Sequence, residues 1–134
     1  MGAYNENNTM NWSAVGAGAM AIGVAAGAFG AHALKGRLDS YSMTVYEKAV
    51  FYHFIHALGL LIVPLFARLD LLSPNGASRV AMLLLAGIVL FSGSLYTLAL
   101  SGVRVLGAVT PFGGVAFIAA WALLAFELAR HSRS

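Results

Sequence analysis

The chain has 134 residues, of which 60% are hydrophobic and 10% are charged. Soluble domains carry charge on about a quarter of their residues, so this composition excludes an ordinary soluble protein or a separate soluble catalytic domain. The net charge of +3 does not indicate nucleic-acid binding, because the Lys and Arg residues stand singly beside apolar segments, and the absence of cysteine excludes disulfides and thiolate chemistry.

Four segments of the chain contain no Asp, Glu, Lys or Arg. They are residues 12–34, 49–67, 80–103 and 105–126. An apolar helix of about 20 residues, at about 1.5 Å per residue, crosses a hydrocarbon core of about 30 Å. The sequence therefore predicts an all-α, polytopic membrane protein, a bundle of four transmembrane helices embedded in the lipid bilayer.

One transmembrane domain is expected over residues 12–130. It is preceded by a polar N-terminal extension, residues 1–11, and followed by a short C-terminal tail, residues 131–134. The expected helices are 12–35, 45–66, 79–100 and 111–130. The first ten residues contain no Lys or Arg, so the basic start of a secretory signal is missing, and Met10 is a second candidate start of translation. The first helix is therefore expected to remain in the membrane.

The first expected helix is rich in small residues. Gly23 and Gly27 form a GxxxG pair, and Gly30 extends the same face. In lipid such a face lets two helix backbones approach closely, which makes it a packing surface. The sequence leaves open whether this surface packs within the bundle or forms a homodimer seam. Gly36 is the expected stop of the helix.

The second expected helix has a start signal at Thr44 and Glu47, which have the spacing of a capping box. The loop after it contains Ser73-Pro74-Asn75-Gly76, which is typical of a turn. Because of this turn signal, the third helix is placed from residue 79 onward.

The fourth expected helix begins at the pair Thr110-Pro111, because Thr is a good N-cap and Pro is tolerated at the first helical position. Gly113 and Gly114 give its start a second close-packing surface, and residues 101–109 are left as a loop. Residues 27–36 and 93–102 align with four identities in ten. This faint repeat favours two duplicated helical hairpins.

Polar side chains gather in one half of the membrane, on the side of the first and third loops. They are His32, Tyr52, His53, His56, Ser94, Tyr96 and Thr110. Ionisable residues inside a membrane are costly, so they are candidates for function. With His32 and His56 as the candidate ligands, the cluster could hold a metal ion, a haem or a quinone, or relay protons. Alternatively each imidazole donates a hydrogen bond to a neighbouring helix.

Several ordered motifs resemble one known family. They are Gly-Ala-Phe-Gly-Ala-His-Ala-Leu-Lys at 27–35, Ala-Val-Phe-Tyr at 49–52 with His-Ala-Leu at 56–58, Phe-Ser-Gly-Ser-Leu-Tyr at 91–96, and Leu-Gly at 106–107 with Thr-Pro-Phe-Gly-Gly at 110–114. The chain is similar to the domain-of-unknown-function 423 family, the YgdD-like small inner-membrane proteins with a small mitochondrial relative.

The resemblance implies a four-span fold in an energy-transducing membrane and brings no established activity. Within the motifs it marks His32, Lys35, Tyr52, His56, Ser94, Tyr96 and Thr110. His53 lies outside the family pattern, which weakens a pair of ligands on the second helix. Lys48 stands where the family pattern has Thr.

We expect a non-enzymatic accessory or assembly subunit that packs on the helices of a membrane-protein partner or of a second copy. The alternative is a protein that binds a small ligand through the polar cluster. Before the first helix there is no Lys or Arg, whereas Lys35, Arg37 and Lys48 follow it. The positive-inside rule therefore predicts that both termini lie outside a bacterial cytoplasmic membrane.

Overall fold

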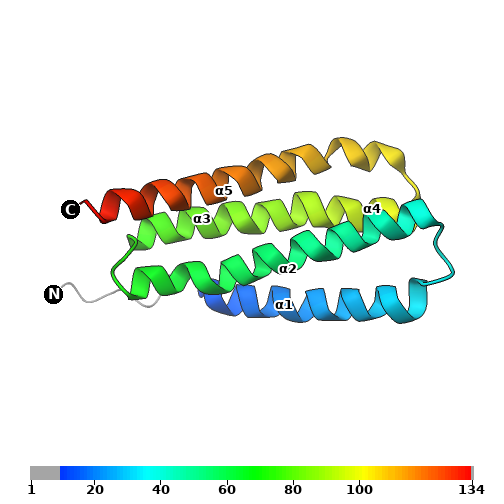
Figure 1. Ribbon diagram of the computed structural model, residues 1–134, viewed down its shortest axis with the longest axis horizontal. Coiled ribbons are helices and arrows are strands. Elements are labelled where there is room, and N and C mark those ends of the chain that lie inside the picture. Colours follow the sequence, from blue (N-terminus) through cyan, green and yellow to red (C-terminus); the bar gives the residue numbers. More distant parts are fainter. Residues whose placement is uncertain (1–9, 134) are drawn as a thin grey trace.

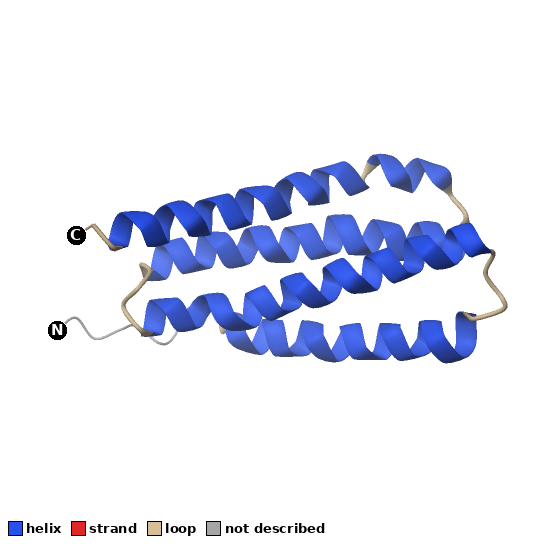
Figure 2. Cartoon of the chain, in the orientation of Figure 1, coloured by secondary structure: helices blue, strands red, loops and turns tan. Residues whose placement is uncertain are grey.

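The computed structural model describes residues 10–133 and contains only helices in this range (Figures 1 and 2). The expected N-terminal extension lies almost entirely outside the described residues. The helical segments are α1 (Trp12–Phe29), η1 (Gly30–Leu34), α2 (Ser40–Arg68), α3 (Pro74–Gly87), η2 (Ile88–Ser92), α4 (Gly93–Ser101), η3 (Arg104–Ala108) and α5 (Thr110–His131).

These segments combine into four helices that are long and apolar enough to cross a membrane. The spans are Trp12–Leu34, Ser40–Arg68, Pro74–Ser101 and Arg104–His131. The all-α, four-span prediction is therefore confirmed. At about 1.5 Å per residue, α2 is about 43 Å long, which matches the full thickness of a bilayer including its headgroup layers.

The helices lie side by side in chain order, with both described ends at the same end of the molecule (Figure 1). α1 packs on α2, α2 packs on α3 and α4, and α5 packs on α3 and η2. The main core lies between α2, α3 and α5, and it includes Leu60, Val63, Val80, Leu84 and Ala120. α1 is the least covered span, since only 17% of its most apolar window is buried.

α2 begins at Ser40, five residues earlier than the sequence predicts. Asp39 is its N-cap, and the Asp39 side chain accepts a hydrogen bond of 2.7 Å from the backbone N–H of Ser42. The expected capping residue Thr44 lies inside the helix and donates back to the carbonyl of Ser40. The capping-box interpretation is therefore wrong, because an acidic cap upstream already satisfies the first turn.

α3 also starts earlier than predicted, at Pro74, because Ser73 caps it and Pro74 occupies the first turn. The expected turn is thus the start of the helix. α5 begins at Thr110, but the Thr110 side chain makes no capping hydrogen bond. The expected loop before α5 contains the short 3-10 helix η3.

Two spans contain a π-helical segment. η1 ends the first span and η2 interrupts the third, where the backbone N–H of Gly93 bonds to the carbonyl of Ile88. Gly36 and Gly102, which follow the first and third spans, both have positive φ, of 83° and 73°. These two glycines occupy equivalent ends of the faint repeat, and the duplication stays a prediction.

Three glycines of α1 and η1, Gly23, Gly27 and Gly30, face α2. A side chain at Gly23 would contact the ring of Phe54, and one at Gly30 would collide with the ring of Tyr46. Gly27 lies opposite Val50 and Phe54. Of the two alternatives left open by the sequence, the structure thus shows packing within the bundle for this face.

The closest backbone approaches occur at two other points. A Cβ at Gly16 would overlap the backbone of Leu60 and Leu61, and one at Gly113 would overlap the backbone of Phe91. Gly114 lies beside the ring of Phe91. At the first point the hydroxyl of Ser13 donates to the carbonyl of Leu61 at 3.2 Å, which adds a hydrogen bond between α1 and α2.

Candidate functional site

His53 joins three helices. Its side chain is 4% exposed, and its Nε2 lies 2.8 Å from the carbonyl oxygen of Ala19 on α1. Its Nδ1 lies 2.9 Å from the hydroxyl of Tyr96 on α4. Because a carbonyl can only accept, Nε2 carries the proton and the Tyr96 hydroxyl donates to Nδ1. His53 is therefore a neutral hydrogen-bonded bridge between α1, α2 and α4.

Tyr46 adds a second link between α2 and α1 beside His53. The sequence did not predict it as a site residue. Its hydroxyl donates to the carbonyl of Ala26 on α1 at 2.5 Å, and its ring packs edge-on against Tyr96. Tyr46 precedes His53 by seven residues, which places both on one face of α2. This spacing is the signal that would have identified it.

His56 belongs to a different environment, a cluster of rings between α2 and α5. Its ring is 4% exposed and stacks on Phe117 with centroids 3.4 Å apart, and Tyr52 and Trp121 lie at 5.9 Å. Its Nδ1 donates to the carbonyl of Tyr52, one turn earlier, at 2.6 Å. Its Nε2 bonds to none of the residues that the structure describes.

Two serines make further links between helices. Ser92, fully buried in η2, donates to the carbonyl of Ala49 on α2 at 2.8 Å. Ser94 lies 2.7 Å from the Thr110 hydroxyl at the start of α5 and also donates to the carbonyl of Phe91. Between residues 10 and 133, every fully buried polar side-chain atom has a hydrogen-bond partner, and the unbonded Nε2 of His56 is not fully buried.

The predicted cluster is thus divided into separate groups. His32 lies exposed in η1 and takes part in none of the hydrogen bonds described above. No three His, Asp or Glu side chains within the described part of the chain are grouped so that they could hold a metal ion. His53 and His56 lie about 20 and 24 Å along α2, which starts at Ser40, so both are close to its middle.

The outward surface of α1 carries a run of small side chains, flanked by the exposed Ile22 and Val24. Along the centre of this surface, small exposed side chains recur at intervals of four and three residues, which is the spacing of one helix face. They are Ala14, Gly18, Ala21, Ala25 and Ala28. We call these five residues the small-residue face. The outer surface of α5 is bulky over its first half and at Phe126, and it also exposes small residues near its C-terminal end. The bulky residues are Phe112, Val115, Ile118 and Phe126, which are 61–71% exposed, and the small ones are Ala122, Ala125 and Ala129.

A profile of the family described as "Protein of unknown function (DUF423)" matches residues 26–114. The chain belongs to the DUF423 family. Its curated relatives include UPF0382 membrane proteins of Staphylococcus epidermidis, 50% identical over 105 residues, and of Staphylococcus haemolyticus, 48% identical over 103 residues. These alignments cover 78% and 77% of this chain, and 82% of each relative.

A further relative is the UPF0382 membrane protein YwdK of Bacillus subtilis, 48% identical over 104 residues, which are 77% of this chain and 83% of YwdK. The relatives are named as membrane proteins, and their names state no activity. No solved structure matches the chain. The DUF423 match includes His53, Tyr96 and Thr110, whereas most of the small-residue face precedes residue 26.

Proposed function

We propose that this DUF423 protein is a non-enzymatic accessory or assembly subunit, and that α1 packs on a helix of a membrane-protein partner through the small-residue face. The observation that carries the proposal is that this face stays uncovered while the glycine-rich face of the same helix is used within the bundle. A helix with two close-packing faces can join two neighbours at once.

Lipid and a neighbouring helix favour different side chains on the surface of a membrane helix. Lipid tails attract Leu no less than they attract another helix, so apolar character alone does not drive helices together in a membrane. Small residues instead let a second backbone approach, which increases van der Waals contact. The small-residue face fits a helix, whereas the bulky first half of the outer surface of α5 fits lipid.

The internal polar groups support a role in packing rather than in chemistry. His53, Ser92 and Ser94 each bond to a neighbouring helix within the chain. Such bonds fix the rotation of each helix, so that α1 presents its outward face in a defined direction.

Leucine substitution tests the proposal. On native gels in mild detergent, Ala21→Leu should migrate as a smaller species than the wild type, because Leu separates the approaching backbones. Ala122→Leu, the same change at an exposed position of α5, is the matched control. If both variants keep the wild-type assembly size, the small-residue face is not a docking surface. Migration as a multiple of the chain's own mass would identify a homo-oligomer.

The location follows from the same architecture. The chain is an integral membrane protein with four candidate spans. We assign it to the bacterial cytoplasmic membrane with both termini outside, because the positive residues near the first span follow it. Fusions of alkaline phosphatase and green fluorescent protein to the C-terminus test the orientation, and a fluorescent, phosphatase-negative fusion would reverse it.

A second candidate function has its own observation. His56 has its Nδ1 occupied and its Nε2 unbonded among the described residues, beside the rings of Phe117 and Trp121. A single nitrogen of this kind suits one axial haem bond or one hydrogen bond from a hydroquinone. Titration of the purified protein with haem or a soluble quinol, with His56→Leu as the control, decides this alternative.

A further inference from the structure

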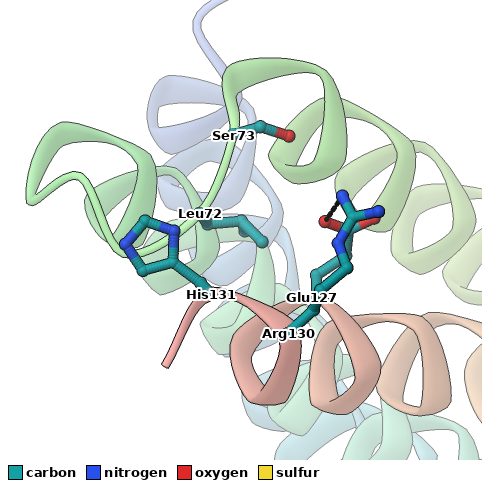
Figure 3. A pocket seen from close by; sticks show the side chains of 5 residues that line it. All are labelled: Leu72, Ser73, Glu127, Arg130 and His131. Atoms are coloured by element: carbon teal, nitrogen blue, oxygen red, sulfur yellow. Dashed lines mark hydrogen bonds and ion pairs between the residues drawn. The ribbon is translucent and has the colours of Figure 1, made fainter. Parts of the chain in front are cut away.

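A cavity of about 350 Å³ lies at the end of the bundle that carries the chain termini. Leu72, Ser73, Glu127, Arg130 and His131 line it. Figure 3 shows Glu127 and Arg130 on one side, His131 on the other and Leu72 between them. The volume is in the range of small-molecule sites, and the lining combines an acidic group, a basic group and an apolar floor.

The cavity lies at the boundary between hydrocarbon and headgroups. Glu127 is the first charged residue after the uncharged segment 105–126, and Arg130 follows one turn later. Leu72, which is buried, lines the same cavity from the loop between α2 and α3. The molecules most concentrated at this level are phospholipids, whose headgroups occupy this layer.

Glu127 is held toward the bundle rather than toward water. Its side chain is 11% exposed, whereas that of Arg130 is 68% exposed. The carboxylate lies over the first turn of α3, and a Cβ at Gly76 would stand 3.4 Å from it. A glycine at residue 76 therefore leaves room for the carboxylate, and the positive end of α3 favours its charge.

The ion pair between these residues can be opened by a ligand. Glu127 and Arg130 are 3.4 Å apart, three residues from each other on α5, with Arg130 largely in solvent. Because the Arg130 guanidinium is largely in solvent, water competes for it and the net contribution of the pair is small. A ligand that carries both a cation and an anion can replace the pair and satisfy each partner.

We propose that this cavity binds the headgroup of a phospholipid that carries a primary ammonium, the phosphoethanolamine type. The ammonium donates to the Glu127 carboxylate, and the phosphate accepts from the Arg130 guanidinium. The hydroxyl of Ser73 accepts from the N–H of Gly76, so its proton is left to donate to a phosphate oxygen. The acyl chains run along the apolar end of α5. This lipid site is independent of the helix-docking face of α1.

The chemistry predicts an order of preference among lipids. A choline headgroup has the same charges but no N–H donor, so it cannot hydrogen-bond to Glu127. A glycerol headgroup has no cation and leaves the carboxylate near the phosphate uncompensated. Ethanolamine lipids should therefore bind best.

Native mass spectrometry of the delipidated full chain in detergent tests the site. Dioleoyl-phosphatidylethanolamine should bind about three- to tenfold more tightly than the phosphatidylcholine or phosphatidylglycerol with the same acyl chains, which is the usual net contribution of one hydrogen bond. Equal binding of the three lipids by the wild-type chain would overturn the proposal, whatever the variants do.

Glu127→Gln should reduce the preference for ethanolamine to about onefold, because the amide has nearly the same shape without the charge. Glu47→Gln, at an exposed position near the other end of the bundle, should leave the preference unchanged. Arg130→Gln should weaken all three phospholipids. A preference that persists in Glu127→Gln would contradict the assignment, and soluble phosphoethanolamine that displaces the lipid at equal concentration would identify a free metabolite instead.

Discussion

At the scale of single residues, His53 carries the largest share of the polar contacts between helices. One imidazole bonds to the backbone of α1 and to a side chain of α4 while standing on α2. Few side chains can accept at one atom and donate at another within the same rigid ring, and neutral histidine does both. The contacts explain why a polar group is retained in the middle of an apolar span.

Replacement of His53 should destabilise the bundle. His53→Leu leaves the Tyr96 hydroxyl without its acceptor, and we expect a loss of about 1–2 kcal/mol, because hydrogen bonds between membrane helices average about 0.6 kcal/mol and reach about 1.7. Unfolding by titration with a denaturing detergent measures this. His32→Leu, at an exposed position, should change little, and equal losses for both variants would disprove the bridge.

Two glycines of α1 offer a matched comparison. Gly16→Ala should destabilise the fold by about 1–3 kcal/mol, because the added Cβ meets the backbone of α2, which cannot move aside as a side chain would. Gly18→Ala adds the same methyl group where no atom lies within 4 Å, so it should be neutral or slightly stabilising. Similar unfolding midpoints for the two variants would contradict the close contact at Gly16.

At the scale of elements, the cap of α2 links stability to pH. The backbone N–H of Ser42, bonded to the Asp39 carboxylate, lowers the pKa of Asp39 from its usual 3.8. The ionised form is thus favoured in the folded state, so the stabilisation is present above about pH 4 and is lost as the pH falls through the lowered pKa.

Asp39→Asn provides the test, because Asn keeps the capping acceptor and cannot ionise. The wild type should lose more thermal stability than Asp39→Asn when the pH in detergent is lowered from 6 to 3. The other acidic groups are common to both proteins, so the difference reports Asp39 alone. Parallel losses would show that this cap does not contribute to the pH dependence.

Hydropathy predicted the spans well, because length and the absence of charge are properties of the segment itself. The starts of α2 and α3 were predicted too late. Asp39 caps α2, but Thr44 also has the spacing of a cap; Ser73 caps α3, but the sequence around it is also typical of a turn. The π-helical segments were not predicted. They depend on packing against other helices, which the local sequence does not describe.

At the scale of the whole molecule, the sequence grouped the polar residues by their expected depth in the membrane. Depth alone does not determine which side chains are in contact. His32 and His56 were placed in one cluster from their depth, yet His32 is exposed and His56 is buried among rings. Contact depends on the rotation of each helix about its axis, which a list of depths does not give. The same limit explains why Tyr46 was not identified as a contact residue.

We propose that the bundle presents the small-residue face of α1 to another membrane helix. The most direct measurement is photo-crosslinking in intact cells with a benzophenone amino acid placed at Ala21, compared with Ile118 on α5, which is 71% exposed. If α1 docks on a partner helix, the probe at Ala21 should give one discrete protein adduct, and Ala25→Leu should abolish it. The probe at Ile118 should give only lipid adducts. Lipid adducts alone from both positions would contradict this docking.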